Sequence, residues 1–299
     1  LNNEKGYTPF IDSLIDHSLV FKNAYANGKR SIEGIPAILA GIPALMSEPF
    51  ITSSYSGNAF KSLASLLSSN GYSSAFYHGG TNGTMGFDNF SRSCGYERYY
   101  GRYEYNDDKD FDGNWGIYDE PFLLRFAVNM NSMKPPFITT VFTLTSHHPY
   151  NIPPAFIGKF PAGTLPIHKS VQYTDYSLRS FFNYASSQVW YQNTLFVITT
   201  DHTALSEKPF YQNRVGMYSI PLIFFRPDGS LKGMEEKVSQ QIDIMPSVLD
   251  YLNFDKPYFS FGSSVFDSSA QGFAINYLND TYQYIDKDYS LILDTIQGN

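Results

Sequence analysis

Asp201 and His202 follow the strand-like run FVITT at residues 196–200, and this adjacent pair has the side chains best suited to chemistry. A carboxylate and an imidazole placed directly after a strand can bind a divalent cation through oxygen and nitrogen ligands. A structural role is also open, in which Asp201 caps a helix and His202 packs against the sheet. The pair by itself leaves both interpretations standing.

Ser31 lies between the basic turn NGKR (residues 27–30) and an apolar stretch that runs to residue 46. Serine at the start of a helix most often serves as its N-cap. The same helix start offers N–H groups and partial positive charge to a phosphate or sulfate, and Arg30 adds charge beside it. Because a serine hydroxyl is a weak nucleophile until a base or metal activates it, a cation held by Asp201 and His202 would give Ser31 a catalytic role.

Histidines also follow two other strand-like runs, His78 in FYHGG and the pair His147–His148 in TLTSHHPY. Taken alone, each is more often a satisfied structural histidine than a ligand. The glycines after His78 would let the backbone approach a ligand closely, although a simple turn explains them as well. In the pair, one histidine can contact a substrate while the other packs.

Apolar strands alternate with helices along the chain, which indicates an α/β fold with a mostly parallel central sheet flanked by helices. Ligands of open α/β sheets bind at the carboxyl ends of the strands, so we expect the polar residues above to meet at one edge. We predict strands within residues 73–80, 136–145, 194–200 and 220–225, and helices within residues 7–21, 31–46, 59–72, 173–187 and 239–254.

The pattern changes after Gly262, where alternating runs and turn residues are typical of an antiparallel hairpin or meander. We therefore predict a catalytic domain over residues 1–262 and a small C-terminal β subdomain over residues 263–299.

Composition excludes several classes of protein. The net charge is −7 and the chain has no Lys/Arg tract, so we expect no nucleic-acid partner. The single cysteine, Cys94, rules out an intrachain disulfide and a cysteine-based zinc site. No run of about 18 apolar residues is present. The sequence opens on Leu1 rather than Met, and we expect it to be a fragment of a longer protein.

The acidic run DKDFDGNWGIYD (residues 108–119) has the spacing of a calcium-binding loop, with Asp119 in the closing position. Flanking helices are not evident in the sequence. We therefore predict an acidic surface loop with a buried Trp115 rather than a calcium site.

Seven short motifs occur in a specific order along nearly the whole chain: YTPFIDSL, NGKRS, FYHGG, TLTSHHPY, TTDHT, IPLIFF and QIDIMPSVLDYL. In this order the sequence resembles the extracellular catalytic domain of lipoteichoic-acid-synthase-like proteins, within the sulfatase and alkaline phosphatase superfamily.

The resemblance implies roles for particular residues. Ser31 occupies the position of the family's nucleophile in NG-x-R-[TS], and with Asp201 and His202 it would ligate one divalent cation, manganese, magnesium or zinc. His147 would face the substrate phosphate or the leaving group, and His78 would contact the head group. The resemblance also implies an extracytoplasmic (periplasmic or extracellular) domain, attached to the cell membrane by upstream transmembrane helices.

Three departures from the family pattern bear on the function. The family's remaining metal ligand, a glutamate on the first strand, would lie upstream of this chain, and Glu4 sits in a polar stretch that does not resemble that strand. A tryptophan and an arginine that grip glycerol phosphate are replaced by Met85 and Phe87, and only Asp88 matches. The C/S-x-P-x-R motif for formylglycine formation is absent at Ser31, so we expect it to remain a serine.

These observations predict a metal-dependent phosphotransferase of the cell envelope that moves a phospholipid-derived head group, phosphoglycerol- or phosphoethanolamine-like, through a covalent Ser31 intermediate. Its partners would be a phospholipid and a glycolipid or glycan. The predicted substrate-binding residues are Arg30, His78, Asp88 and His147. Two alternatives stay open: a sulfatase-like hydrolase of sulfate or phosphate esters, and a degenerate domain that binds envelope glycans or lipids.

Overall fold

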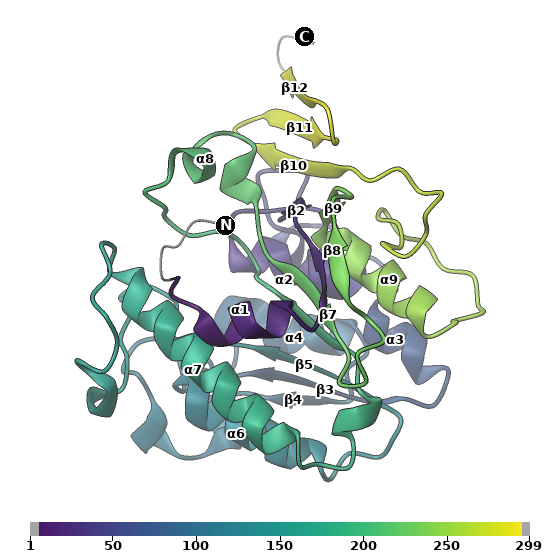
Figure 1. Cartoon of the computed structure of the whole chain (residues 1–299). Helices are drawn as coiled ribbons and strands as arrows, with labels where there is room; N and C mark the ends of the chain where they lie inside the picture. The colour runs from purple at the N-terminus through teal and green to yellow at the C-terminus, as the bar shows by residue number, and fades with distance from the viewer. Residues whose placement is uncertain (1–5, 295–299) are drawn as a thin grey trace. The chain divides into compact units, whose positions relative to one another are not determined.

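The computed structural model describes residues 6–294, which form two compact units, each assembled from segments far apart in sequence (Figure 1). The first unit contains the described residues up to residue 17, residues 70–195 and residues 226–230. The second contains residues 18–69 and 196–225, and the described chain from residue 231 onward. The domain boundary predicted at residue 262 stays a prediction, and Glu4 lies outside the described residues.

The first unit is an α/β structure around a parallel three-stranded sheet, in which β3 lies between β4 and β5 (Figure 1). Its helices and strands are α1 (Pro9–Ile15), β3 (Ser73–His78), α4 (Phe87–Ser93), β4 (Arg98–Tyr100), α5 (Arg102–Tyr105), α6 (Asp119–Met130), β5 (Phe137–Phe142) and α7 (Ile167–Ala185), with 3₁₀ turns η2 (Thr84–Gly86), η3 (Asp108–Asp110), η4 (Pro154–Phe156) and η5 (Tyr191–Asn193).

Successive side chains of β3 point to opposite faces of this sheet, as the pleat of a strand requires. The Tyr77 ring packs on Phe126 of α6, with centroids 4.8 Å apart, whereas the His78 ring packs on Phe87 of α4. Both faces of β3 are therefore covered, which explains why five of its six residues are buried.

The second unit combines several small sheets with four helices. Its elements are β1 (Leu19–Phe21), β2 (Ala24–Tyr25), α2 (Ser31–Ala40), η1 (Phe50–Thr52), α3 (Leu63–Ser68), β6 (Phe196–Thr199), α8 (Pro209–Gln212), η6 (Gly216–Tyr218), β7 (Leu222–Phe225), β8 (Gly233–Glu235), β9 (Ser239–Gln240), η7 (Gln241–Asp243), α9 (Ile244–Tyr251), β10 (Ala274–Leu278), β11 (Thr281–Ile285) and β12 (Ser290–Asp294).

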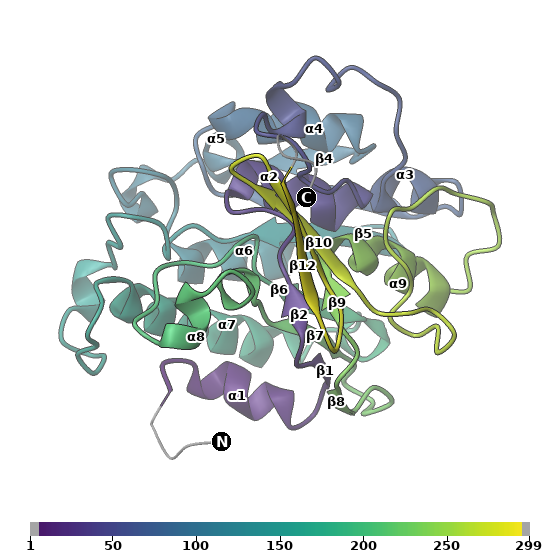
Figure 2. The same ribbon diagram turned by 90° about the horizontal axis from the view of Figure 1, so that it is seen from above.

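Its largest sheet has the order β6-β7-β1-β8, in which only the β1–β8 pairing is parallel. Strands β2 and β9 pair in parallel. Strands β10, β11 and β12 form an antiparallel meander (Figure 2). The predicted α/β fold and the small antiparallel sheet at the C-terminal end are thus confirmed.

The structure departs from the predicted elements in two places. The helix predicted within residues 7–21 ends at Ile15, and residues 19–21 form β1 instead. Strand β1 is hydrogen-bonded to β7 on one side and β8 on the other, so partners distant in sequence override the local helical spacing. Helix α6, which begins at the end of the acidic run, is not among the predicted elements.

Helix α2 is short because specific residues fix where it begins and where it ends. The Glu33 carboxylate accepts hydrogen bonds from the backbone N–H groups of Lys29 and Arg30, which lie ahead of the first turn. The helix ends at Ala40 because Gly41 adopts the left-handed conformation, with φ of 62°. It therefore covers only the first ten residues of the stretch 31–46.

A buried carboxylate in η7 makes the stability of this protein depend on pH. Burial raises the pKa of Asp243 to about 7, although its hydrogen bonds from the backbone N–H groups of Ser263 and Gln240 oppose the shift. The folded state therefore holds a proton that the unfolded chain loses near pH 3.9. We expect the free energy of unfolding to fall as pH rises from about 4 to about 7, by up to about 1.4 kcal/mol per pH unit for this one proton.

Urea unfolding at a series of pH values measures this slope, and Asp243→Asn should flatten it over that range. Asp255→Asn, which changes an exposed carboxylate, is the matched control and should leave the slope unchanged. An equal slope in the wild type and in Asp243→Asn would contradict the assignment to Asp243.

Candidate active site

Ser31 is the first helical residue of α2, and Arg30 rather than Ser31 occupies the N-cap position. The interpretation of Ser31 as the N-cap is therefore wrong by one residue. Its hydroxyl is not used for capping, and Ser31 Oγ lies 3.4 Å from Nε2 of His202. The side chain stands in the first turn, where the backbone N–H groups have no carbonyl partner within the helix.

His202 presents one ring nitrogen to both Ser31 and Asp201. Its Nδ1 donates to the carbonyl of Thr203 at 2.8 Å, which in the neutral ring leaves the lone pair on Nε2. That same Nε2 lies 3.4 Å from Oδ2 of Asp201 and 3.4 Å from Oγ of Ser31. In a Ser-His-Asp triad the carboxylate holds the opposite nitrogen, so this arrangement is not a triad.

The donor set suits a divalent cation. A lone pair, a carboxylate oxygen and a hydroxyl oxygen converge from Ser31, Asp201 and His202, and nitrogen and oxygen donors are the ligands that Zn²⁺ and Mn²⁺ accept. Within residues 6–294 there is no group of three or more His, Cys, Asp or Glu side chains that could hold a metal. Among the described residues, the candidate site therefore has two ligands of these types, Asp201 and His202. Ser31 would be the third ligand.

A close approach between α2 and the Asp201 backbone brings these three residues together. A Cβ atom at Gly34 would overlap the carbonyl group of Asp201, so only glycine allows this contact. Gly34 lies three residues after Ser31 and so on the same face of the helix. Gly34 is not among the site residues predicted from the sequence, although the i, i+3 spacing of serine and glycine is a usable signal.

Gln241 fixes the same loop from the other side. Its side-chain amide donates to the carbonyl groups of Thr200 and Asp201, at 2.8 and 2.7 Å. Its own Oε1 accepts from the backbone N–H of Asn27, which begins the NGKR turn. One buried amide thus connects the turn before Ser31 with the loop that carries Asp201.

The two basic residues before Ser31 have different partners. Lys29 Nζ donates to the Met217 carbonyl and to Thr203 Oγ1, and burial lowers its pKa. The Arg30 guanidinium, which we predicted to bind substrate, is hydrogen-bonded to Glu33 and to the carbonyl of Ser47. Its role in substrate binding stays a prediction.

The other predicted site residues belong to the first unit. His78 ends β3 and is 1% exposed, with its ring stacked on Phe142 and its Nδ1 3.2 Å from the Tyr99 hydroxyl. Burial lowers its pKa to about 4, although Asp88 opposes the shift, so the ring is neutral at pH 7. Within residues 6–294, His78 Nε2 and Asp88 Oδ1 are buried without a hydrogen-bond partner.

His147 lies in the loop after β5 and has the same hydrogen-bond pattern as His202. Its Nδ1 lies 2.9 Å from the His148 carbonyl, which also accepts from the Trp115 indole N–H. The Trp115 ring packs on His147, with centroids 4.0 Å apart. Trp115 is partly exposed rather than buried as predicted, and its contact with His147 was missed.

The Asp119 carboxylate binds the backbone at the start of the loop that carries His147. Its Oδ1 accepts from the backbone N–H groups of Leu144 and Thr145, and its Oδ2 accepts from the Thr174 hydroxyl at 2.6 Å. In the acidic run, Asp108 pairs with Arg102 instead. These two carboxylates have separate partners, and the prediction of an acidic surface loop rather than a calcium site stays a prediction.

Of the three strands expected to bring polar residues to one sheet edge, only β3 and β5 share a sheet, so the expectation is wrong for Asp201 and His202. Strands β3 and β5 are parallel neighbours, with His78 paired to Phe142, so His78 and the His147 loop follow the carboxyl ends of adjacent strands. Asp201 and His202 follow β6 in the second unit, and no helix starts with them, since α8 begins at Pro209.

Comparison with known proteins identifies the family. A family model described as sulfatase matches residues 1–254. The chain belongs to the sulfatase family. It is 27% identical to lipoteichoic acid synthase 1 of Bacillus subtilis over 229 residues, which cover 70% of this chain and 36% of that protein. The chain therefore matches only about a third of the length of this relative.

Solved structures confirm the fold of the alkaline phosphatase superfamily. A member of that superfamily from Vibrio parahaemolyticus superposes with a TM-score of 0.86 at 25% identity, covering 96% of this chain and 71% of that one. The lipoteichoic acid synthase LtaP of Listeria monocytogenes gives a TM-score of 0.82 at 17% identity, covering 98% and 80% of the two chains. Between residues 6 and 294, no helix is both long and apolar enough to cross a membrane.

Replacement of Gly34 by alanine should disrupt this site. The added Cβ meets a backbone carbonyl that cannot rotate away, so α2 and the Asp201 loop must separate. We expect Gly34→Ala to lower the free energy of unfolding by about 1–3 kcal/mol and to abolish any increase in melting temperature produced by Mn²⁺.

Gly57→Ala is the matched control, because a Cβ at Gly57 meets nothing within 4 Å. Its effect on stability should stay within about 0.5 kcal/mol. Urea unfolding and thermal melts with and without Mn²⁺ measure both variants. Wild-type stability in Gly34→Ala would contradict the positioning role of this close contact.

Proposed function

We propose that this protein is a metal-dependent phosphotransferase of the cell envelope, which moves a phospholipid-derived head group through a covalent intermediate on Ser31. The head group would be phosphoglycerol- or phosphoethanolamine-like. The acceptor would be a glycolipid or glycan, or water, and the reaction would take place outside the cytoplasm at the cell membrane. Membership of the sulfatase family and the similarity to lipoteichoic acid synthases support this proposal.

One observation carries the proposal: Oγ of Ser31 and Oδ2 of Asp201 face the same nitrogen of His202. Ser31, Asp201 and His202 would hold one divalent cation, manganese, magnesium or zinc. Such a cation, when bound, favours the ionised serine and polarises the phosphoryl oxygens.

In the proposed reaction, Ser31 Oγ forms a bond to phosphorus while the bond from phosphorus to the lipid alcohol breaks. The Ser31 proton is lost as Oγ becomes the nucleophile, and the lipid alkoxide takes up a proton as it leaves. The acceptor oxygen then forms a bond to phosphorus while the bond from phosphorus to Ser31 Oγ breaks. The acceptor hydroxyl gives up its proton and Ser31 Oγ takes one up, which restores the free serine. His78, Asp88 and His147 are proposed to contact the head group or the leaving group.

Substitution of the nucleophile tests this proposal in the full-length protein. Ser31→Ala should lower the Mn²⁺-dependent release of diacylglycerol from phosphatidylglycerol or phosphatidylethanolamine vesicles by at least about a thousandfold. Ser31→Thr keeps a hydroxyl at the same atom and is the matched control, which should retain measurable turnover. Undiminished turnover in Ser31→Ala would exclude the covalent mechanism.

A sulfatase-like hydrolase is the second candidate, because the matching family model is described as sulfatase. Mass spectrometry of the peptide that contains Ser31 separates these chemistries. We expect the unmodified serine mass, because SIEGI lacks the C/S-x-P-x-R pattern. A peptide with the mass of formylglycine would favour sulfate ester hydrolysis instead.

A degenerate binding domain is the third candidate. Metal analysis of the purified full-length protein distinguishes it from an enzyme. Absence of metal, together with glycan binding that survives His202→Ala, would favour this function over catalysis.

A further inference from the structure

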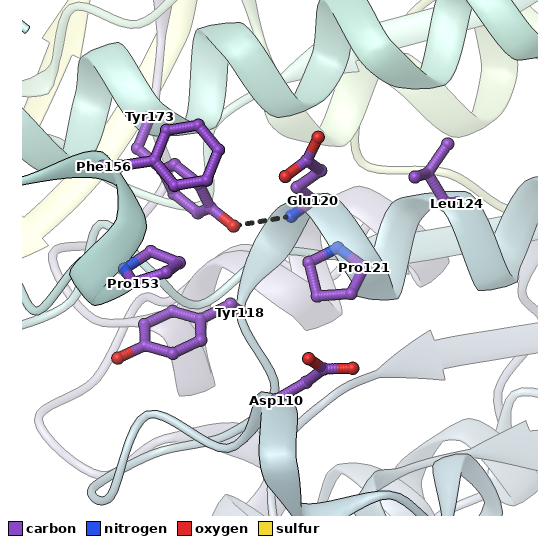
Figure 3. A pocket seen from close by; sticks show the side chains of 8 residues that line it. All are labelled: Asp110, Tyr118, Glu120, Pro121, Leu124, Pro153, Phe156 and Tyr173. Atoms are coloured by element: carbon purple, nitrogen blue, oxygen red, sulfur yellow. Dashed lines mark hydrogen bonds between the residues drawn. The ribbon is translucent and has the colours of Figure 1, made fainter. Parts of the chain in front are cut away.

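We propose that a cavity in the first unit binds a small organic ammonium group, primary or quaternary. The cavity has a volume of about 340 Å³ and lies between the start of α6, the 3₁₀ turns η3 and η4, and α7 (Figure 3). This volume is at the lower end of the range for small-molecule sites. The proposal concerns residues that the function proposed for Ser31 does not use.

Three aromatic rings line the cavity, and the Tyr173 ring lies at a steep angle to each of the other two. The Tyr173 ring meets Phe156 at 5.0 Å and 68°, and it meets Tyr118 at 6.3 Å and 82°. Steeply inclined rings present faces in different directions, and each face carries the negative end of the ring quadrupole. The Tyr173 ring is itself fully buried, so the ring faces available to a cation are those of the partly exposed Tyr118 and Phe156. Ring faces of this kind attract alkylated ammonium groups.

Two carboxylates add negative charge to the same cavity. Asp110 accepts the Tyr105 hydroxyl through Oδ2, and Glu120 accepts the Ser180 hydroxyl through Oε1. Among the described residues, the hydrogen bonds of these two carboxylates leave Asp110 Oδ1 and Glu120 Oε2 for a ligand. These oxygens would attract the N–H groups of a primary ammonium, or the methyl groups that share the positive charge of a quaternary one.

The cavity lining favours an ammonium group over a neutral sugar. Apart from the carboxylates and rings, the described side chains around it are two prolines and a leucine, and none is Lys, Arg, Asn or Gln. Sugar hydroxyls need both donors and acceptors, whereas a primary ammonium group only donates and a quaternary one does neither. The lining offers the four oxygens of two carboxylates as acceptors and two tyrosine hydroxyls as donors, so acceptors outnumber donors.

The protein itself provides one example of this interaction. Lys159 Nζ lies 4.6 Å from the centroid of the Phe156 ring, so that ring already attracts an ammonium group within the same chain. Lys159 is exposed and does not line the cavity. It therefore serves as an internal competitor in the experiment that follows.

Calorimetric titration of the whole chain with choline, and separately with ethanolamine, tests the proposal. The neutral carbon analogue of choline, 3,3-dimethyl-1-butanol, has the same shape without the charge. We expect choline or ethanolamine to bind at least about tenfold more tightly than this analogue. Equal binding of the neutral analogue, or binding of neutral glucose but of neither ammonium compound, would overturn the proposal.

Variants locate the binding site. Glu120→Gln keeps the hydrogen bond to Ser180 and removes one charge, and Phe156→Leu removes one ring, so each should weaken ammonium binding several-fold. Glu97→Gln removes an exposed charge elsewhere in the same unit and is the matched control. Lys159→Ala should leave binding unchanged or strengthen it. Wild-type affinity in both Glu120→Gln and Phe156→Leu would overturn the assignment to this cavity.

Lipid vesicles distinguish the two possible sources of the ammonium group, a lipid head group and a free small molecule. If the ligand is a lipid head group, phosphatidylcholine or phosphatidylethanolamine vesicles should compete with choline and phosphatidylglycerol vesicles should not. If soluble ammonium compounds bind and none of these vesicles competes, the cavity takes a free small molecule. Either result supports the binding of an ammonium group. In either case Glu120→Gln must weaken that binding.

Discussion

The backbone of Asp201 lies so close to α2 that a single methyl group at position 34 would collide with it. The positions of the candidate site residues depend on this contact. It sets the distance from Ser31 on the helix to His202 on the loop, and Gln241 fastens the same loop through two carbonyl groups. Packing of backbone on backbone is rigid, because neither surface has a rotamer through which it can yield.

Two histidines in different units use the same hydrogen bond. His147 and His202 each direct Nδ1 at the carbonyl of the next residue, His148 or Thr203. In the neutral ring this leaves the lone pair on Nε2, the state in which histidine accepts a proton or binds a metal. His78 differs, because burial among aromatic rings keeps it neutral and leaves its Nε2 unpaired among the described residues.

The acidic run 108–119 shows what the spacing of residue types predicts and what it leaves to tertiary contacts. Its carboxylates match a calcium loop in sequence, yet Asp108 pairs with Arg102, and Asp119 binds the backbone ahead of the His147 loop. A pattern of residue types predicts which ligands are available, whereas the direction of each side chain depends on partners from other segments. For the same reason, Asp110 lines the proposed ammonium-binding cavity together with aromatic rings from α7 and η4.

The sequence by itself determined the α/β class, the C-terminal meander and the identity of the residues that could do chemistry, because periodicity and residue type are local properties. It also placed Ser31 at the start of a helix, to within one residue of its observed position. Only the tertiary structure decided that Ser31, Asp201 and His202 meet at one nitrogen, and that Leu19–Phe21 form a strand. These outcomes depend on contacts between segments separated by more than 150 residues, and no local pattern records such contacts.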